Sequence, residues 1–190
     1  MLKRFGVAGG VIFTLLGFLS EKSFGQYSWE SALSLPLDGS SSGVMEQTQQ
    51  RYWWKITIPV DGALAVTTHS GALLEIDNYL YDQNGTTQLA GYDSSGRNVI
   101  DRTHHNNLRP GVYYICSVRY DGTGSYTIQS VFIPSRLAND PEPNDSSRVA
   151  VSFEPNSSRT GHLGYYGNGY TDKEDWRKIT IPSDGALLVK

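Results

Sequence analysis

The sequence predicts an all-β protein, built as one antiparallel β-sandwich followed by part of a second. Three observations lead to this fold class. The chain holds 12 Tyr and 20 Gly among 190 residues, which is typical of short strands joined by tight turns. Short strand-like segments follow one another and are separated by turn residues. A domain-sized stretch of the chain also repeats.

The first sandwich is expected to span residues 26–133. Its turns are predicted at Asp61-Gly62, Asn84-Gly85, Pro110-Gly111 and Asp121-Gly122, pairs that favour hairpins. Between these turns the sequence predicts strands at residues 41–46, 52–58, 63–68, 74–81, 87–92, 112–118 and 125–132. Short antiparallel strands at this spacing are typical of a β-sandwich. Residues 101–107 are expected to form a polar loop.

An internal repeat marks a second domain. Residues 55–59, Lys-Ile-Thr-Ile-Pro, recur as residues 178–182, an offset of 123 residues (178 − 55). Asp-Gly-Ala-Leu at 61–64 recurs at 184–187, and Trp53 recurs as Trp176. A period of this length indicates tandem domains and excludes the short units of a solenoid.

The second copy is expected to be incomplete. Residues 134–143 form an acidic, proline-rich linker, and residues 144–190 form the partial copy. Its last residue, Lys190, matches Thr67, so strands corresponding to residue 74 onward have no counterpart in the sequence. A partial sandwich leaves one sheet face uncovered and one edge unpaired. We interpret residues 144–190 as a truncated domain or fragment.

The charge balance and the cysteine content exclude several classes of protein. Lys and Arg total 16 against 19 Asp and Glu, a formal net charge of −3. This balance does not predict a basic surface of the kind that binds nucleic acid, or an attraction to anionic lipid. The single cysteine, Cys116, excludes an internal disulfide framework and a cysteine-rich zinc site.

The first 25 residues have the pattern of an export signal. Lys3 and Arg4 precede an apolar run at residues 7–19, and Ser23 and Gly25 supply the small residues of a cleavage site. The run is shorter than the roughly 20 apolar residues that a membrane span needs. The alternatives are a buried N-terminal helix and a lipid-facing anchor. We expect a secreted protein beginning at Gln26, with no membrane association after cleavage.

The mature chain resembles the bacterial pre-peptidase C-terminal domain family, which includes the collagen-binding modules of clostridial collagenases. The residues that carry the resemblance lie at 53–58, 61–64, 80–85, 108–115 and 122–128. The resemblance implies a jelly-roll-like sandwich that accompanies secreted enzymes and has no catalytic residues of its own.

Acidic side chains of the second copy suggest a calcium site. Asp140, Glu142, Asn144 and Asp145 lie in an extended, proline-containing segment, and Asp172 and Asp175 precede the Trp176 strand. Calcium takes six to eight oxygen ligands from such groups. In the collagen-binding relatives, an acidic linker and an Asp-x-x-Asp of this pattern bind calcium together, which makes all six residues candidate ligands. The alternative is a solvated acidic linker.

The first copy is predicted to bind no calcium. At the offset of 123, Asp172 corresponds to Gln49 and Asp175 to Tyr52, and residues 26–29 include no carboxylate. Neutral side chains cannot compensate the dehydration of a divalent ion.

No residues predict an enzyme. His104 and His105 are adjacent, and neighbouring side chains of an extended chain point to opposite sides, so the pair is interpreted as part of a surface loop. Cys116 lies within a predicted strand and is interpreted as a small buried side chain. The sequence also has no Gly-x-Ser-x-Gly, His-Glu-x-x-His or phosphate-binding glycine motif.

Aromatic residues supply a weaker candidate for ligand binding. Alternation along residues 53–58 places Trp54, Ile56 and Ile58 toward the core and Trp53 outward. An outward Trp53 near Tyr114 or Tyr120 could stack on sugar rings or on a proline-rich polypeptide. The alternative is that Trp53 packs under a loop or edge.

Three functions follow from these patterns. The first is a non-catalytic secreted module that binds an extracellular protein or polysaccharide, or assists a linked hydrolase. The second is a structural spacer stiffened by calcium. The third is a fragment of a larger secreted peptidase or glycosidase.

Overall fold

The computed structural model of the chain describes residues 28–48, 51–92, 96–97, 100–136, 142–161 and 163–190. The predicted signal peptide and Asp140 lie outside the described residues. Apart from a three-residue 3-10 helix, η1 (Trp29–Ser31), the regular structure is all β. Within the described part of the chain, no helix has the length and apolar character needed to cross a membrane.

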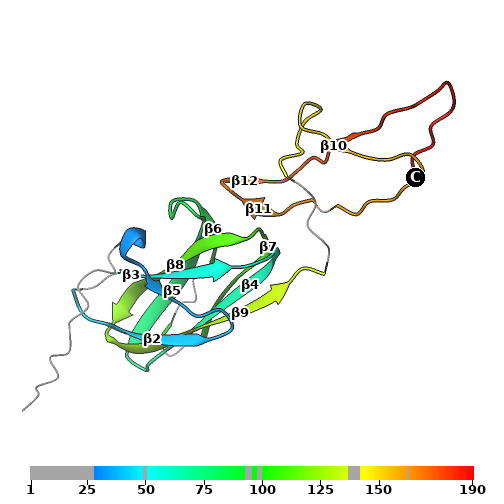
Figure 1. The fold of residues 1–190 in the computed structure, drawn as a ribbon. Coiled ribbons are helices and arrows are strands. Elements are labelled where there is room, and N and C mark those ends of the chain that lie inside the picture. The colour runs from blue at the N-terminus through cyan, green and yellow to red at the C-terminus, as the bar shows by residue number, and fades with distance from the viewer. Residues whose placement is uncertain (1–27, 49–50, 93–95, 98–99, 137–141, 162) are drawn as a thin grey trace, which may run out of the picture.

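Two sheets pack face to face as a sandwich (Figure 1). The first sheet has the order β1 (Leu33–Ser34), β3 (Arg51–Ile58), β8 (Gly111–Gly122), β5 (Leu74–Tyr81) and β6 (Gln88–Tyr92). The second has the order β12 (Tyr170–Thr171), β11 (Tyr166–Gly167), β7 (Ile100–Leu108), β4 (Gly62–Ser70), β9 (Gly124–Pro134) and β2 (Ser40–Met45). A separate pair joins β10 (Val151–Ser152) to β13 (Arg177–Lys178).

The predicted all-β sandwich is confirmed, and its sheets are mixed at their edges. All pairs among the long strands are antiparallel, whereas the two-residue strands β1 and β11 run parallel to β3 and β7. The chain passes from β1 to β3 through β2, which lies in the other sheet. It can therefore return in the same direction without the long crossover that a full parallel pair within one sheet requires.

The core forms from the side chains that point inward from both sheets. Trp54, Ile56 and Ile58 of β3 are buried, as the sequence predicts. Trp54 Nε1 donates a hydrogen bond of 3.2 Å to the hydroxyl of Tyr126 on β9, in the opposite sheet. Since a buried indole N–H or phenol needs a partner, this bond fixes how the two sheets face each other.

Strand β7 corrects the expectation of a polar loop at residues 101–107. Its inward side chains Asp101 and Thr103 are buried, and both are bonded to Asn78 of β5. Asn78 Nδ2 donates to Asp101 Oδ2 at 3.3 Å, and Ser117 Oγ donates to Asn78 Oδ1 at 2.8 Å. Because the strand carries polar residues on its inward face, it lacks the apolar alternation that predicts a strand.

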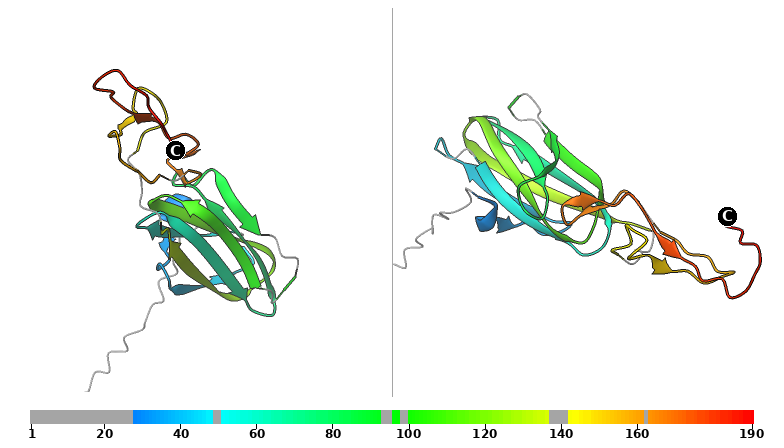
Figure 2. Two further views of the ribbon diagram at one scale, coloured as in Figure 1. Left: turned by 90° about the vertical axis from the view of Figure 1, so that its right-hand side faces the viewer. Right: turned by 90° about the horizontal axis from the view of Figure 1, so that it is seen from above.

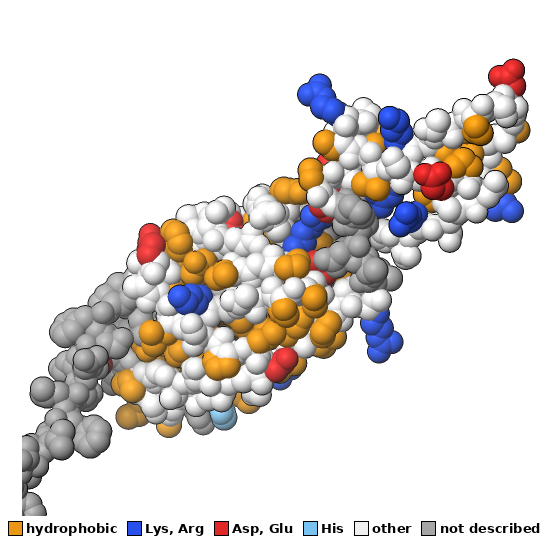
Figure 3. Space-filling model, viewed as in Figure 1, with side chains coloured by type: hydrophobic (Ala, Val, Ile, Leu, Met, Phe, Trp, Pro, Cys, Tyr) orange, Lys and Arg blue, Asp and Glu red, His pale blue; other side chains and the backbone are white. Residues whose placement is uncertain are grey.

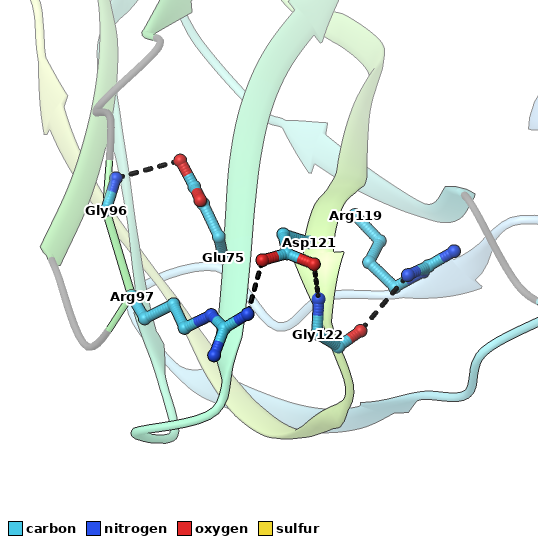
Figure 4. A network of polar contacts seen from close by, with 6 residues as sticks. All are labelled: Glu75, Gly96, Arg97, Arg119, Asp121 and Gly122. Atoms are coloured by element: carbon cyan, nitrogen blue, oxygen red, sulfur yellow. Dashed lines mark hydrogen bonds and ion pairs between the residues drawn. The ribbon is translucent and has the colours of Figure 1, made fainter.

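A polar network closes the end of the sandwich where β8 finishes (Figure 4). Glu75 Oε1 accepts the N–H of Gly96 at 2.8 Å, and Arg97 forms an ion pair with Asp121. Arg119 donates to the carbonyl of Gly122 at 3.1 Å. The first two contacts join the connection after β6 to β5 and to the end of β8. The opposite end of β8 contacts the C-terminal segment.

The C-terminal segment, residues 142–190, extends from one end of the sandwich (Figures 1 and 2). It repeats the local pattern of the first residues of the sandwich. Phe153 N donates to the carbonyl of Lys178 at 2.8 Å, as Leu35 N does to that of Lys55 at 2.8 Å. Asn156 and Asp38 both have positive φ, at 59° and 53°.

The offset between equivalent residues changes within the repeat. Phe153 corresponds to Leu35 at an offset of 118 residues (153 − 35), whereas its partner Lys178 corresponds to Lys55 at an offset of 123 (178 − 55). Five additional residues therefore lie in the C-terminal segment between Phe153 and Lys178, a stretch that includes the β11–β12 hairpin.

Apolar residues of the C-terminal segment are exposed where their counterparts are buried. Ile181, Leu187 and Val189 are exposed, whereas the matching residues at the offset of 123, Ile58, Leu64 and Val66, belong to the core. The space-filling view shows apolar side chains along this segment (Figure 3).

The buried network around Asn78 generates a stability prediction. Replacing Asn78 with Leu, which is close in size, removes the amide that bonds both Asp101 and Ser117. We expect the free energy of unfolding, measured in urea, to fall by about 2 kcal/mol or more, because two buried polar groups lose a partner. Asn106→Ala, an exposed change on β7, should alter stability by no more than about 0.5 kcal/mol. Equal stability of the two variants would contradict the role of this network.

Candidate metal centre

The C-terminal segment is held against the start of β8 by backbone and tyrosine contacts. Strand β11 pairs with the end of β7 at Tyr166 and Leu108. Arg109 N donates to the carbonyl of Tyr166 at 2.8 Å, and the hydroxyl of Tyr113 reaches the same oxygen at 3.0 Å. The hydroxyl of Tyr165 donates to Ser135 Oγ at 2.9 Å. Tyr165 and Tyr166 are therefore held against the sandwich.

Three carboxylates converge at this junction. Ligand oxygens of Glu142, Asp172 and Asp175 lie within 4.8 Å of one another. The side chain of Asp172 is 0% exposed. Neither of its carboxylate oxygens accepts a hydrogen bond from the described residues. A buried carboxylate without hydrogen bonds is costly unless cations compensate its charge.

Backbone bonds between the acidic linker and the β11–β12 hairpin produce this convergence. Asp172 N donates to the carbonyl of Tyr165 at 3.0 Å, and Gly164 N donates to that of Asp172 at 2.8 Å. Trp176 N donates to the carbonyl of Asn144 at 2.9 Å, which brings the linker beside residues 172–176. Glu142 Oε2 accepts the N–H of Asn144 at 2.9 Å, so its side chain turns back toward the same point.

The local charges explain the electrostatics of Asp172. Burial raises the pKa of this carboxyl above its ordinary value, and the neighbouring charge of Glu142 raises it further. Asp175 and Asp145 add smaller effects in the same direction, whereas Arg109 opposes them. Arg109 Nη2 lies 2.6 Å from Glu142 Oε1 and 3.0 Å from Asp172 Oδ2. Arg177 Nη2 is 3.8 Å from Asp175 Oδ2.

The structure brings together most of the predicted ligand residues it describes. Glu142, Asp172 and Asp175 form the cluster, and Asn144 is buried, with its backbone N–H bonded to Glu142. Asp145 is half-buried and close enough for its charge to act on Asp172. These are hard oxygen donors, and the buried oxygens of Asp172 fit a cation ligand.

Arg109 is the residue of this centre that sequence reasoning missed. It directly precedes the predicted turn at Pro110-Gly111, far from the acidic residues in sequence, and no spacing rule connects it to them. Acidic and basic side chains lie together where the C-terminal segment leaves the sandwich (Figure 3).

The three aromatic candidates do not form one exposed strip. Trp53 is 5% exposed, because it packs with Ala32 and Cys116 and its ring lies 5.1 Å from that of Tyr81. Tyr114 is half-buried and contacts the ring of Trp29 at 5.3 Å. Tyr120 alone of the three is well exposed, at 73%. The packing alternative thus describes Trp53, which lies under the N-terminal segment.

The histidine pair and the cysteine do not belong to the acidic cluster. His104 is exposed on β7, whereas His105 is half-buried, and burial lowers the pKa of its imidazole. Burial raises the pKa of the Cys116 thiol to about 12. A thiol of this kind stays protonated and inert.

Comparisons with known proteins found a similarity in solved structures alone. No protein-family model and no curated protein sequence matches the chain. The chain is similar to the pre-peptidase C-terminal domain of a collagenase from Bacillus anthracis, with 17% identity and a TM-score of 0.44 over 52% of this chain and 93% of that one. It is also similar to a β-glucosidase from Paenibacillus barengoltzii, with 17% identity and a TM-score of 0.28, over 54% of this chain and 11% of the enzyme.

Proposed function

We propose that this protein is a secreted, non-catalytic accessory module related to the pre-peptidase C-terminal domain family, and that calcium binds where its C-terminal segment meets the sandwich. The observation that carries the proposal is Asp172. Its carboxylate is buried, accepts no hydrogen bond from the described residues and lies beside Glu142 and Asp175.

The chemistry of the donors favours calcium over softer metals. Glu142, Asp172 and Asp175 supply carboxylate oxygens, and the buried Asn144, whose backbone N–H contacts Glu142, is the candidate for an additional amide oxygen. Zinc and copper sites in proteins rely on thiolate or imidazole ligands, which this cluster lacks among its described members. Magnesium demands a near-ideal octahedron, whereas calcium accepts six to eight oxygens in flexible geometry. The candidate ligands come from both the linker and the segment after the hairpin, and calcium tolerates the irregular geometry of such a set better than magnesium does.

The calcium site belongs to a second copy of the sandwich in this proposal. The matching hydrogen bonds of Leu35 and Phe153, and the positive φ of Asp38 and Asn156, support reading residues 144–190 as that copy. A cation that joins Glu142 of the linker to Asp172 and Asp175 would order the connection between copies.

A connecting role has more support than polymer binding. The acidic cluster lies at the junction of the two parts, whereas Trp53 is buried and Tyr114 is half-buried. Tyr120 is the one well-exposed aromatic residue among the three candidates. A single ring offers little surface on which a polymer could stack. We therefore assign the module a spacer function first and a polymer-binding function second, both in the service of a linked secreted hydrolase.

Calorimetry with calcium tests the metal centre. The full chain should bind calcium, and the double variant Asp172→Asn and Asp175→Asn should lose at least about tenfold in affinity, because two anionic ligands become neutral amides. A matched control removes two exposed acids of the C-terminal segment, Glu154→Gln and Asp184→Asn. Equal affinity of the two double variants would show that Asp172 and Asp175 are not ligands.

The first sandwich alone should bind no calcium. A chain of residues 26–136 retains the buried core apart from Tyr166, but lacks Glu142, Asp172 and Asp175. We expect it to unfold cooperatively and to give the same melting temperature with and without millimolar calcium, since ligand stabilisation requires a site. A calcium-dependent rise in its melting temperature would place a site in the first copy.

A further inference from the structure

The cationic side chain nearest the centre of the acidic cluster comes from the first sandwich. Arg109 follows β7, whereas Glu142, Asp172 and Asp175 all belong to the C-terminal segment. The guanidinium group is largely buried, and one nitrogen, Nη2, contacts both Glu142 and Asp172. The ring of Tyr170, on β12, lies 5.8 Å from the same guanidinium carbon.

This nitrogen occupies the space that a metal ion would need. Nη2 is 2.6 Å from Glu142 Oε1 and 3.0 Å from Asp172 Oδ2, and calcium lies about 2.3–2.6 Å from its oxygen ligands. An ion that used the same two oxygens would therefore lie within about 5 Å of the guanidinium nitrogen, where two positive charges repel strongly in a buried setting. The two cations compete for one pair of carboxylates.

We propose that Arg109 is a built-in counter-cation of this centre, and that a divalent cation binds by displacing the guanidinium from Glu142 and Asp172. The inference rests on the proposed calcium function and adds its regulation. Arg109 keeps the buried carboxylates compensated while no metal is bound, and sets the concentration of calcium at which the ion replaces it.

The exchange changes the connection between the two parts of the protein. With Arg109 in place, an ion pair joins the first sandwich to the linker and to residue 172. After displacement, the ion joins Glu142, Asp172 and Asp175, all within the C-terminal segment. The backbone bond from Arg109 N to Tyr166 and the pairing of β7 with β11 do not involve the guanidinium. The side chain can therefore leave while this backbone contact stays.

Calcium titration of the full chain and of Arg109→Gln tests the proposal. The variant removes the competing charge and keeps the backbone contacts, so its dissociation constant for calcium should be at least about tenfold lower than that of the unchanged chain. Arg102→Gln is the matched control, because it removes the same charge from an exposed position on β7, and its affinity should stay within about threefold. Far-UV circular dichroism checks that each variant is folded, and Arg109→Lys, which keeps the charge, provides a second variant with affinity close to that of the unchanged chain.

A spectroscopic measurement separates displacement from simple repulsion. The Nε–H signal of Arg109, assigned in the ¹H–¹⁵N spectrum by its loss in Arg109→Gln, should shift on addition of calcium, while that of Arg102 stays in place. Calcium binding with equal affinity by the chain and by Arg109→Gln, or an unmoved Arg109 signal at saturation, would overturn the counter-cation and leave the calcium site standing. Absence of calcium binding by the chain and by every variant would overturn both proposals.

Discussion

A carboxylate buried at the junction controls how the two parts of this protein meet. Asp172 has no exposed side-chain surface, and its charge must be balanced locally because water cannot reach it. The balancing cation in the structure is Arg109, which belongs to the other part of the chain. One unfavourable burial is thus balanced across the junction, where the linker, the segment after the β11–β12 hairpin and Arg109 lie together.

The sandwich itself relies on polar pairs in the same way. Trp54 and Tyr126 join the two sheets through one hydrogen bond, and Asn78 joins β5 to β7 through its bond with Asp101. Apolar burial supplies most of the stability of such a core, but it is non-directional. Buried hydrogen bonds have strict geometry, so they select one arrangement of the sheets among many that would bury similar area.

Sequence reasoning found the elements whose pattern is local. The strand at residues 74–81 was predicted with the bounds that β5 has, since apolar residues and flanking turns both mark it. Strand β7 was missed because Asp101 and Thr103 are polar and become satisfied only through Asn78, which is distant in sequence. The acidic pattern and the family resemblance predict Glu142, Asp172 and Asp175 as candidate ligands, and the structure brings these carboxylates together. Arg109 contacts them solely through the tertiary fold, so no sequence pattern points to it.

The five residues that separate the two offsets of the repeat have a consequence for how such a protein can arise. Duplicating a sequence produces two similar units but no surface that joins them. Here the extra length falls in the stretch with the β11–β12 hairpin, and this hairpin both pairs with β7 and leads into Asp172. Connections between strands tolerate insertion at little thermodynamic cost. In the proposed second copy, the five extra residues therefore fall in the connection that supplies the contact with the sandwich.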